Sequence, residues 1–97
     1  MFEWDEAKRR ATIEKHGIDF LDAAEILNGP HYVLDGNSQV EIRKIAVGWL
    51  DGRHIAVVYT LRGEAIRLIT ARKARRDERE RYQALFPGTD PGDEKPH

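Results

Sequence analysis

The chain has 97 residues, the size of one domain, and a domain this small buries only about two thirds of the surface that its unfolded chain exposes. It contains no cysteine, which excludes a disulfide framework and thiolate chemistry and fits a reducing cytoplasm. No apolar run approaches the roughly 20 residues of a membrane-spanning helix, and the N-terminus lacks the pattern of a signal peptide.

Charge is unevenly distributed along the chain. Residues 1–42 hold 4 Lys and Arg against 9 Asp and Glu, a net charge of −5, whereas residues 43–82 hold 11 against 5, a net charge of +6. The whole chain has a net charge of −1. Such asymmetry predicts one positively charged surface on an otherwise acidic protein, unless the two parts neutralise each other internally.

The first thirty residues predict a helical hairpin. Asp5 is expected to cap a helix that runs to about His16 and stops at Gly17, and a short strand over residues 2–4 can precede it. Asp19 is expected to cap a second helix with an apolar face at spacings of three and four residues. Proline and glycine end this helix at residues 28–30.

The middle of the chain predicts four antiparallel strands joined by short turns. The turn signals are Asp35-Gly36-Asn37, Asp51-Gly52 and Arg62-Gly63. The strands they separate are expected at residues 31–34, 40–50, 53–61 and 65–71. The third is nearly continuously apolar, so we expect it to be central and covered on both faces.

A last helix is expected from about Arg72. Its inward face is predicted to carry Ala71, Ala74, Glu78, Tyr82 and Leu85. Residues 87–97 are rich in proline, glycine and charge and are expected to be a disordered tail, which leaves residues 1–86 as a single domain. The predicted fold is therefore α+β, with a helical hairpin, a four-stranded meander and a C-terminal helix.

Arginines inside and after the last strand are the first candidate functional residues. Strict alternation places Arg67 with Ala65, Ile69 and Ala71 on one face of the strand. A guanidinium there suits a carboxylate or a phosphate, and an ion pair with Glu78 is the structural alternative. For the whole group, phosphate binding is favoured because nearby acids are too few; its members are Arg62, Arg67, Arg72, Lys73, Arg75 and Arg76.

A second basic patch on the first helix comprises Lys8, Arg9, Arg10, Lys15 and His16. Such a run is usually a solvated face. His16, however, is expected at the helix C-terminus, where the cationic form is favoured, and a histidine can act as general acid or base near neutral pH. The alternative role of His16 is to cap carbonyl groups at the end of the helix.

Two tyrosines are further candidates, and a metal site is not expected. Tyr59 and Tyr82 can each stack on a base or bind a phosphate, although packing on the sheet is the slightly favoured role of Tyr82. The four histidines show no metal-binding spacing and have no cysteine partners, so neither a metal nor another cofactor is predicted.

The same residues carry a resemblance to a known family. Most of residues 2–82 resembles the BrnT toxins, which are the toxin half of type II toxin–antitoxin pairs and have a RelE-like ribonuclease fold. The matching pieces are FEWDEAK at 2–8, KHGIDFLDAAEIL at 15–27, EIR at 41–43, VVYTLRG at 57–63 and IRLITARKA at 66–74, with Glu78 and Tyr82 behind them. Thr12 and Thr70 depart from the usual asparagine and serine, and we expect neither to contact the catalytic cations.

The resemblance implies a cytoplasmic bacterial toxin that cleaves RNA and inhibits translation. It also implies a BrnA-like antitoxin with a ribbon-helix-helix DNA-binding domain, in a heterotetramer of two toxins and two antitoxins that represses its own operon. Operator DNA would be bound only through the antitoxin.

The chemistry of metal-free RNA cleavage fits these residues. Arg62, Arg67 and Arg72 are expected to line an RNA groove, in which one or two of them hold the scissile phosphate. RNA contacts are expected from Lys8, Lys15, Tyr59, Lys73, Arg75 and Arg76, and proton transfer from His16 together with Glu64, Glu78 or Tyr82. The alternative function is a non-catalytic module whose arginine face binds an acidic protein or a nucleic acid.

Overall fold

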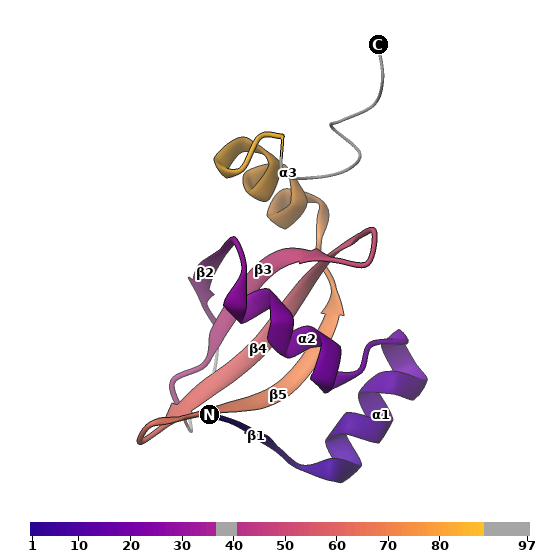
Figure 1. Cartoon of the computed structure of the whole chain (residues 1–97), viewed down its shortest axis with the longest axis vertical. Helices are drawn as coiled ribbons and strands as arrows, with labels where there is room; N and C mark the ends of the chain where they lie inside the picture. The colour runs from indigo at the N-terminus through magenta and orange to yellow at the C-terminus, as the bar shows by residue number, and fades with distance from the viewer. Residues whose placement is uncertain (37–40, 89–97) are drawn as a thin grey trace.

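The structure of the chain, a computed structural model, describes residues 1–36 and 41–88 (Figure 1). Its elements are β1 (Phe2–Trp4), α1 (Glu6–His16), α2 (Phe20–Asn28), β2 (His31–Asp35), β3 (Lys44–Leu50), β4 (Arg53–Arg62), β5 (Ala65–Lys73) and α3 (Arg76–Leu85). The fold is α+β, as predicted: two N-terminal helices, a largely antiparallel sheet and a C-terminal helix.

The helical hairpin forms where the capping residues predict it. The carboxylate of Asp5 accepts hydrogen bonds from two N–H groups in the first turn of α1, and Gly17 ends this helix with a left-handed φ of 69°. The carboxylate of Asp19 caps α2 by accepting a hydrogen bond from the N–H of Leu21. The guanidinium of Arg9 donates two hydrogen bonds to Asp19, at 2.8 and 3.0 Å, and so joins α1 to the start of α2.

The sheet has five strands in the order β1-β5-β4-β3-β2: strands β2 to β5 form the predicted four-stranded antiparallel meander, and β1 adds a fifth strand at its edge. Strand β1 pairs in parallel with β5, with Phe2 opposite Ile66. A strand of three residues gives almost no periodic signal, and its partner is distant in the sequence. Strand β4 is central, as predicted, and the turn before it has positive φ at both Asp51 and Gly52, as its sequence requires.

Two strand boundaries differ from the prediction. Strand β3 begins at Lys44, because residues 41–43 precede the ladder and do not belong to a strand. Strand β5 continues to Lys73, since Arg72 and Lys73 still pair with β4. The predicted strand residue Val40, the turn residue Asn37 and residues 89–97 of the expected tail lie outside the described residues.

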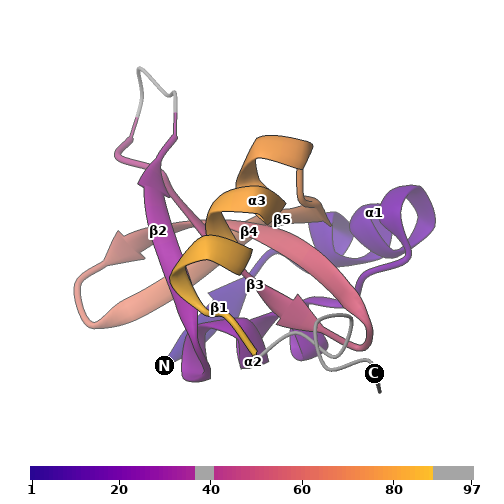
Figure 2. The same cartoon turned by 90° about the horizontal axis from the view of Figure 1, so that it is seen from above.

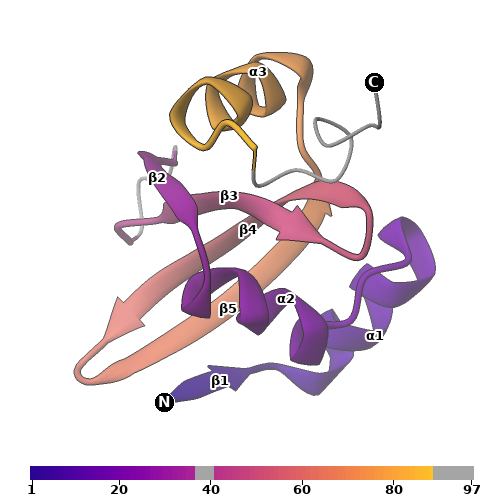
Figure 3. The same ribbon diagram turned by 45° about the horizontal axis from the view of Figure 1, so that its top comes forward.

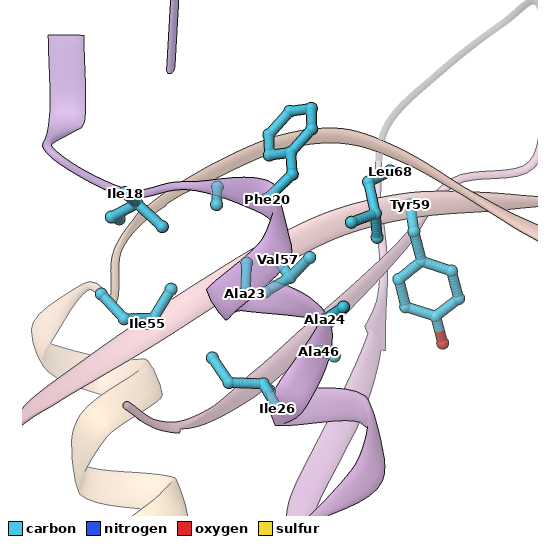
Figure 4. Packing of buried hydrophobic residues seen from close by; sticks show 11 residues of the cluster. Ile18, Phe20, Ala23, Ala24, Ile26, Ala46, Ile55, Val57, Tyr59 and Leu68 are labelled. Atoms are coloured by element: carbon cyan, nitrogen blue, oxygen red, sulfur yellow. The ribbon is translucent and has the colours of Figure 1, made fainter. Parts of the chain in front are cut away.

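Helices cover both faces of the sheet. Figure 2 shows α3 on one face and α2 on the other, while α1 lies beside β5 (Figure 3). The larger core lies between α2 and the sheet and includes Phe20, Ile55 and Leu68 (Figure 4). In this core β3 approaches α2 closely, because a Cβ at Gly48 would lie 2.6 Å from Cγ2 of Ile26. The smaller core includes Ala56 and Tyr82 under α3.

Helix α3 begins at Arg76, later than predicted. Its third residue, Glu78, accepts a hydrogen bond from the N–H of Arg75 at 2.7 Å, which satisfies the backbone at the start of the helix. Ala74, Glu78 and Tyr82 are buried as expected. Leu85 is instead 51% exposed, and Ala71 belongs to β5 and packs in the larger core, so neither lies on the buried face of α3.

Candidate nucleic-acid interface

A β-bulge in β5 determines which arginines share a face of the sheet. Val58 pairs with Thr70 but Tyr59 pairs with Leu68, so Ile69 is an extra residue that reverses the alternation. Leu68 and Ala71, three residues apart, accordingly pack in the same core. The strict alternation used for the sequence prediction was therefore wrong beyond Leu68.

The bulge brings Arg67 and Arg72 to the same face. They pair with Thr60 and Ala56, which share one face of β4 because they are four residues apart. Ala56 packs under α3, so this is the α3 face of the sheet. Arg62 belongs to the same alternating set on β4 and is exposed at the end of the strand. The three predicted arginines thus lie on one face, although two of them have carboxylate partners.

Arg67 is paired with β1. One of its terminal nitrogens, Nη1, lies 2.9 Å from Oε2 of Glu3, the residue opposite it in the parallel pair. The side chains are 28% and 36% exposed, so the pair is partly solvated. The expected partner of Arg67, Glu78, was wrong, because the parallel strand that brings Glu3 beside it was not part of the predicted sheet.

Arg72 is paired with α3. Its two terminal nitrogens donate hydrogen bonds to the two carboxylate oxygens of Glu78 at 2.8 and 3.1 Å. Burial alone would raise the pKa of Glu78, but hydrogen bonds from Arg72 and from the N–H of Arg75 lower it below its usual value. The Glu78 side chain is only 5% exposed, so the pair fastens α3 to the sheet.

A cleft of about 330 Å³ lies between α1 and β5. Four of its lining residues are cationic or can become so, namely Lys8, Lys15, His16 and Arg43. The other four are the threonines Thr12 and Thr70 and the apolar residues Ala11 and Ile69. Two elements far apart in sequence therefore converge with the segment before β3 to form a strongly basic concave site. Such a site suits a phosphate group.

Helix α1 presents the cleft residues because of their spacing. Lys8, Thr12, Lys15 and His16 lie at i, i+4, i+7 and i+8, which is one face of a helix. His16 is the last residue of α1 and is half-buried, while the N–H of Gly17 bonds to the carbonyl oxygen of Ile13 at 2.8 Å. Thr12 and Thr70 line the same cleft as these cations.

The remaining predicted residues fall in three other places. Tyr59 is 8% exposed in the larger core, where burial raises its pKa, and Tyr82 is 1% exposed in the smaller core, so neither ring offers a face to a base. Glu64 is exposed in the turn between β4 and β5. The residues Lys73, Arg75 and Arg76 are exposed where β5 meets α3 and do not line the cleft.

Arg43 is the cationic cleft residue that the sequence did not predict. It lies in no predicted helix face and in no alternating set with another candidate. Its one signal was membership of the matching piece EIR at residues 41–43, a short match that carried no residue role. Only the fold brings it opposite α1.

Two kinds of feature are absent from the described residues. Within residues 1–36 and 41–88, no three His, Cys, Asp or Glu side chains gather as metal ligands. Within the same residues, no helix combines the length and the apolar character that crossing a membrane requires.

Comparison with known proteins agrees with the resemblance seen in the sequence. A search of characterised proteins found no match to the chain. The family model described as the ribonuclease toxin BrnT of type II toxin–antitoxin systems matches residues 4–78, which include α1, all of the cleft and the start of α3. The chain therefore belongs to the BrnT family of ribonuclease toxins, the toxin component of type II toxin–antitoxin systems.

Proposed function

We propose that this ribonuclease toxin cleaves RNA in the cleft between α1 and β5, without a metal ion. The supporting observation is that His16, which can transfer protons, lies in the same cleft as Lys8 and Lys15, which can bind phosphate oxygens. Residues 1–86 form the toxin domain in this proposal.

The reaction we propose uses the ribose 2′-hydroxyl as the nucleophile. Its oxygen forms a bond to the adjacent phosphorus while the bond from phosphorus to the 5′-oxygen breaks. The 2′-hydroxyl loses a proton and the leaving 5′-oxygen gains one, so the products carry a 2′,3′-cyclic phosphate and a 5′-hydroxyl. His16 moves one of these protons, since a lysine or an arginine is too basic to do so at neutral pH.

The lysines have an electrostatic role in this proposal. Negative charge develops on the phosphate oxygens in the transition state, and one well-placed cation can accelerate phosphoryl transfer by about 10³-fold. Lys8 and Lys15 supply such charge from α1. Arg62 and Arg67 extend the basic surface over the α3 face of the sheet, and Lys73, Arg75 and Arg76 bind flanking phosphates.

Arg72 and Glu78 are assigned a stabilising role rather than a catalytic one. Their hydrogen bonds occupy both terminal nitrogens of the arginine and both oxygens of the carboxylate. Tyr59 and Tyr82 are likewise assigned to the two cores. The catalytic set is thus smaller than the sequence alone suggested, and it is centred on α1.

A type II toxin has a cognate antitoxin, and we propose its form for this chain. It is a BrnA-like ribbon-helix-helix protein that binds two toxins as a dimer and carries the operator-binding surface. In the cytoplasm the antitoxin neutralises the toxin, and free toxin inhibits translation by cleaving RNA. Co-expression followed by mass measurement of the purified complex tests the two-to-two stoichiometry, which a one-to-one complex would contradict.

The deciding experiment is expression of the chain alone in bacteria. We expect growth arrest and RNA fragmentation with wild type, and neither with His16→Ala at the same yield of folded protein. Arg10→Ala is the matched control, since Arg10 is an exposed cation of α1 that does not line the cleft. Normal growth and intact RNA with abundant folded wild type would favour the non-catalytic module instead.

A further inference from the structure

Arg43 enters the cleft from outside the regular elements. It immediately precedes β3 and lies across the cleft from α1, whose residues Lys8, Lys15 and His16 form the other wall. Its side chain is 36% exposed, so it is accessible yet partly enclosed. A cation in this place adds positive charge to the wall of the cleft that faces α1.

The backbone around Arg43 is held on both sides. Its carbonyl oxygen accepts a hydrogen bond from the N–H of Gly36 at 2.8 Å. The carbonyl oxygen of the preceding residue, Ile42, accepts one from the hydroxyl of Thr60 at 2.6 Å, and Thr60 is only 3% exposed. Lys44 then begins the ladder with β4. These contacts hold the backbone of Arg43 in place before binding, so only its side chain remains to be ordered around a ligand.

The guanidinium of Arg43 also forms a longer hydrogen bond than the guanidinium groups of Arg67 and Arg72 do. Its only hydrogen bond to a described residue is from Nε to Glu41 at 3.4 Å, near the long limit for such bonds. Arg72 and Arg67 instead use their terminal nitrogens on carboxylates at 2.8 and 2.9 Å. Within residues 1–36 and 41–88, the two terminal nitrogens of Arg43 form no such bond, so both can face a ligand.

We propose that Arg43 is the arginine that holds the scissile phosphodiester, opposite His16. This inference rests on the proposed function of the cleft, and it concerns a residue that was not among the site residues predicted from the sequence. The planar guanidinium donates two parallel N–H bonds to two phosphate oxygens, which a lysine cannot reproduce. Lys8 and Lys15 add charge from the other wall. Thr60 and Gly36 act as positioning residues through the backbone of Arg43.

The test combines cleavage with binding of an uncleavable substrate. Initial rates are measured on a short single-stranded RNA that wild type cleaves, with chelator present. Affinity is measured by fluorescence anisotropy on the same oligonucleotide with 2′-deoxy sugars, over a series of salt concentrations. The variants are Arg43→Ala, Arg43→Gln and Arg43→Lys, with Arg10→Ala as the control that removes a cation outside the cleft.

The expected results separate a phosphate contact from a structural role. Arg43→Ala and Arg43→Gln lower kcat by about 10²–10³-fold, as loss of one transition-state donor does. Each also reduces the salt slope of binding by about 0.7, the value for one single-strand phosphate contact. Arg43→Lys keeps the slope but stays at least about tenfold slow. Thermal unfolding remains close to that of wild type, because the side chain is partly exposed and weakly paired.

The outcomes distinguish this inference from the proposed function. If wild type cleaves RNA and both uncharged variants match Arg10→Ala in rate and salt slope, Arg43 does not hold the phosphate, although the cleft can still be the site. If wild type binds the deoxy oligonucleotide but cleaves no RNA, the proposed function fails. In that case the salt slope still tests Arg43: a slope in Arg43→Gln equal to that of wild type would overturn the phosphate contact.

Discussion

Arg72 on β5 and Glu78 on α3 form a two-bonded ion pair that joins the sheet to the C-terminal helix, at 2.8 and 3.1 Å. The backbone carbonyl of Glu78 also accepts a hydrogen bond from the hydroxyl of Tyr32 at 2.8 Å, which connects the same turn of α3 to β2. Because this residue links three elements, substitutions at the pair are expected to affect folding before they affect chemistry.

Replacement of Arg72 by alanine tests this assignment. The variant leaves the Glu78 carboxylate buried without its cation, which costs about 3–5 kcal/mol in the free energy of unfolding. The double variant Arg72→Leu with Glu78→Leu is expected to recover most of this loss, because it removes both charges. Urea denaturation measures both. A stability of Arg72→Ala within about 0.5 kcal/mol of wild type would show that the pair does not fasten α3.

The pH dependence of stability provides a second test of Glu78. Because its pKa is lowered from the ordinary value of 4.5, its contribution is fully present above pH 4.5 and is lost as the pH falls through the lowered pKa. The difference in unfolding free energy between wild type and Glu78→Gln should therefore shrink on acidification below pH 4.5. A difference that stays constant from neutral pH down to pH 3 would contradict the lowered pKa.

Gly48 should be intolerant of a larger side chain. An added Cβ would lie 2.6 Å from Cγ2 of Ile26, a buried side chain that is only 2% exposed. We expect Gly48→Ala to lower the free energy of unfolding by about 1–3 kcal/mol, the usual cost of overpacking. Gly29→Ala is the matched control: among the described residues, its chain neighbours aside, the nearest atom to the new Cβ is the carbonyl oxygen of Glu25 at 3.8 Å. Equal stability of the two variants would show that β3 and α2 are not packed so closely.

The pair between Arg67 and Glu3 predicts a gain of binding. Glu3→Gln removes the negative charge opposite Arg67 and leaves the guanidinium free for phosphate. Affinity for a 2′-deoxy oligonucleotide should rise, and the salt slope should steepen by up to about 0.7. Glu25→Gln removes an equal charge from the exposed surface of α2 and should change the slope little. If both variants behave alike, Arg67 makes no RNA contact.

Local signals in the sequence were sufficient for the helical hairpin, the tight turn before β4 and the central position of that strand. Asp5, Asp19 and Gly17 act within one or two turns of their own position, so their effect does not depend on the rest of the fold. The short strand β1 is different: its partner lies at the other end of the domain, and three residues carry too little pattern to choose parallel pairing with β5.

The candidate site was predicted only in part, for a related reason. The basic patch on α1 could be read from consecutive residues alone, and its members Lys8, Lys15 and His16 do line the cleft. Arg9 and Arg10 of the same predicted patch do not line it. The bulge at Ile69 has no sequence signature, so alternation along β5 assigned the wrong face to Ala71. Arg43 reaches the cleft only through the pairing of β3 with β4, which no local pattern encodes.

Cleavage of a short RNA by the purified chain in the presence of a chelator is the most direct measurement of the proposed activity. We predict that wild type produces fragments ending in a 2′,3′-cyclic phosphate, that Arg10→Ala does the same, and that His16→Ala is slower by about 10²-fold or more. Full activity of folded His16→Ala, or a wild-type activity that the chelator abolishes, would contradict metal-free cleavage in the cleft between α1 and β5.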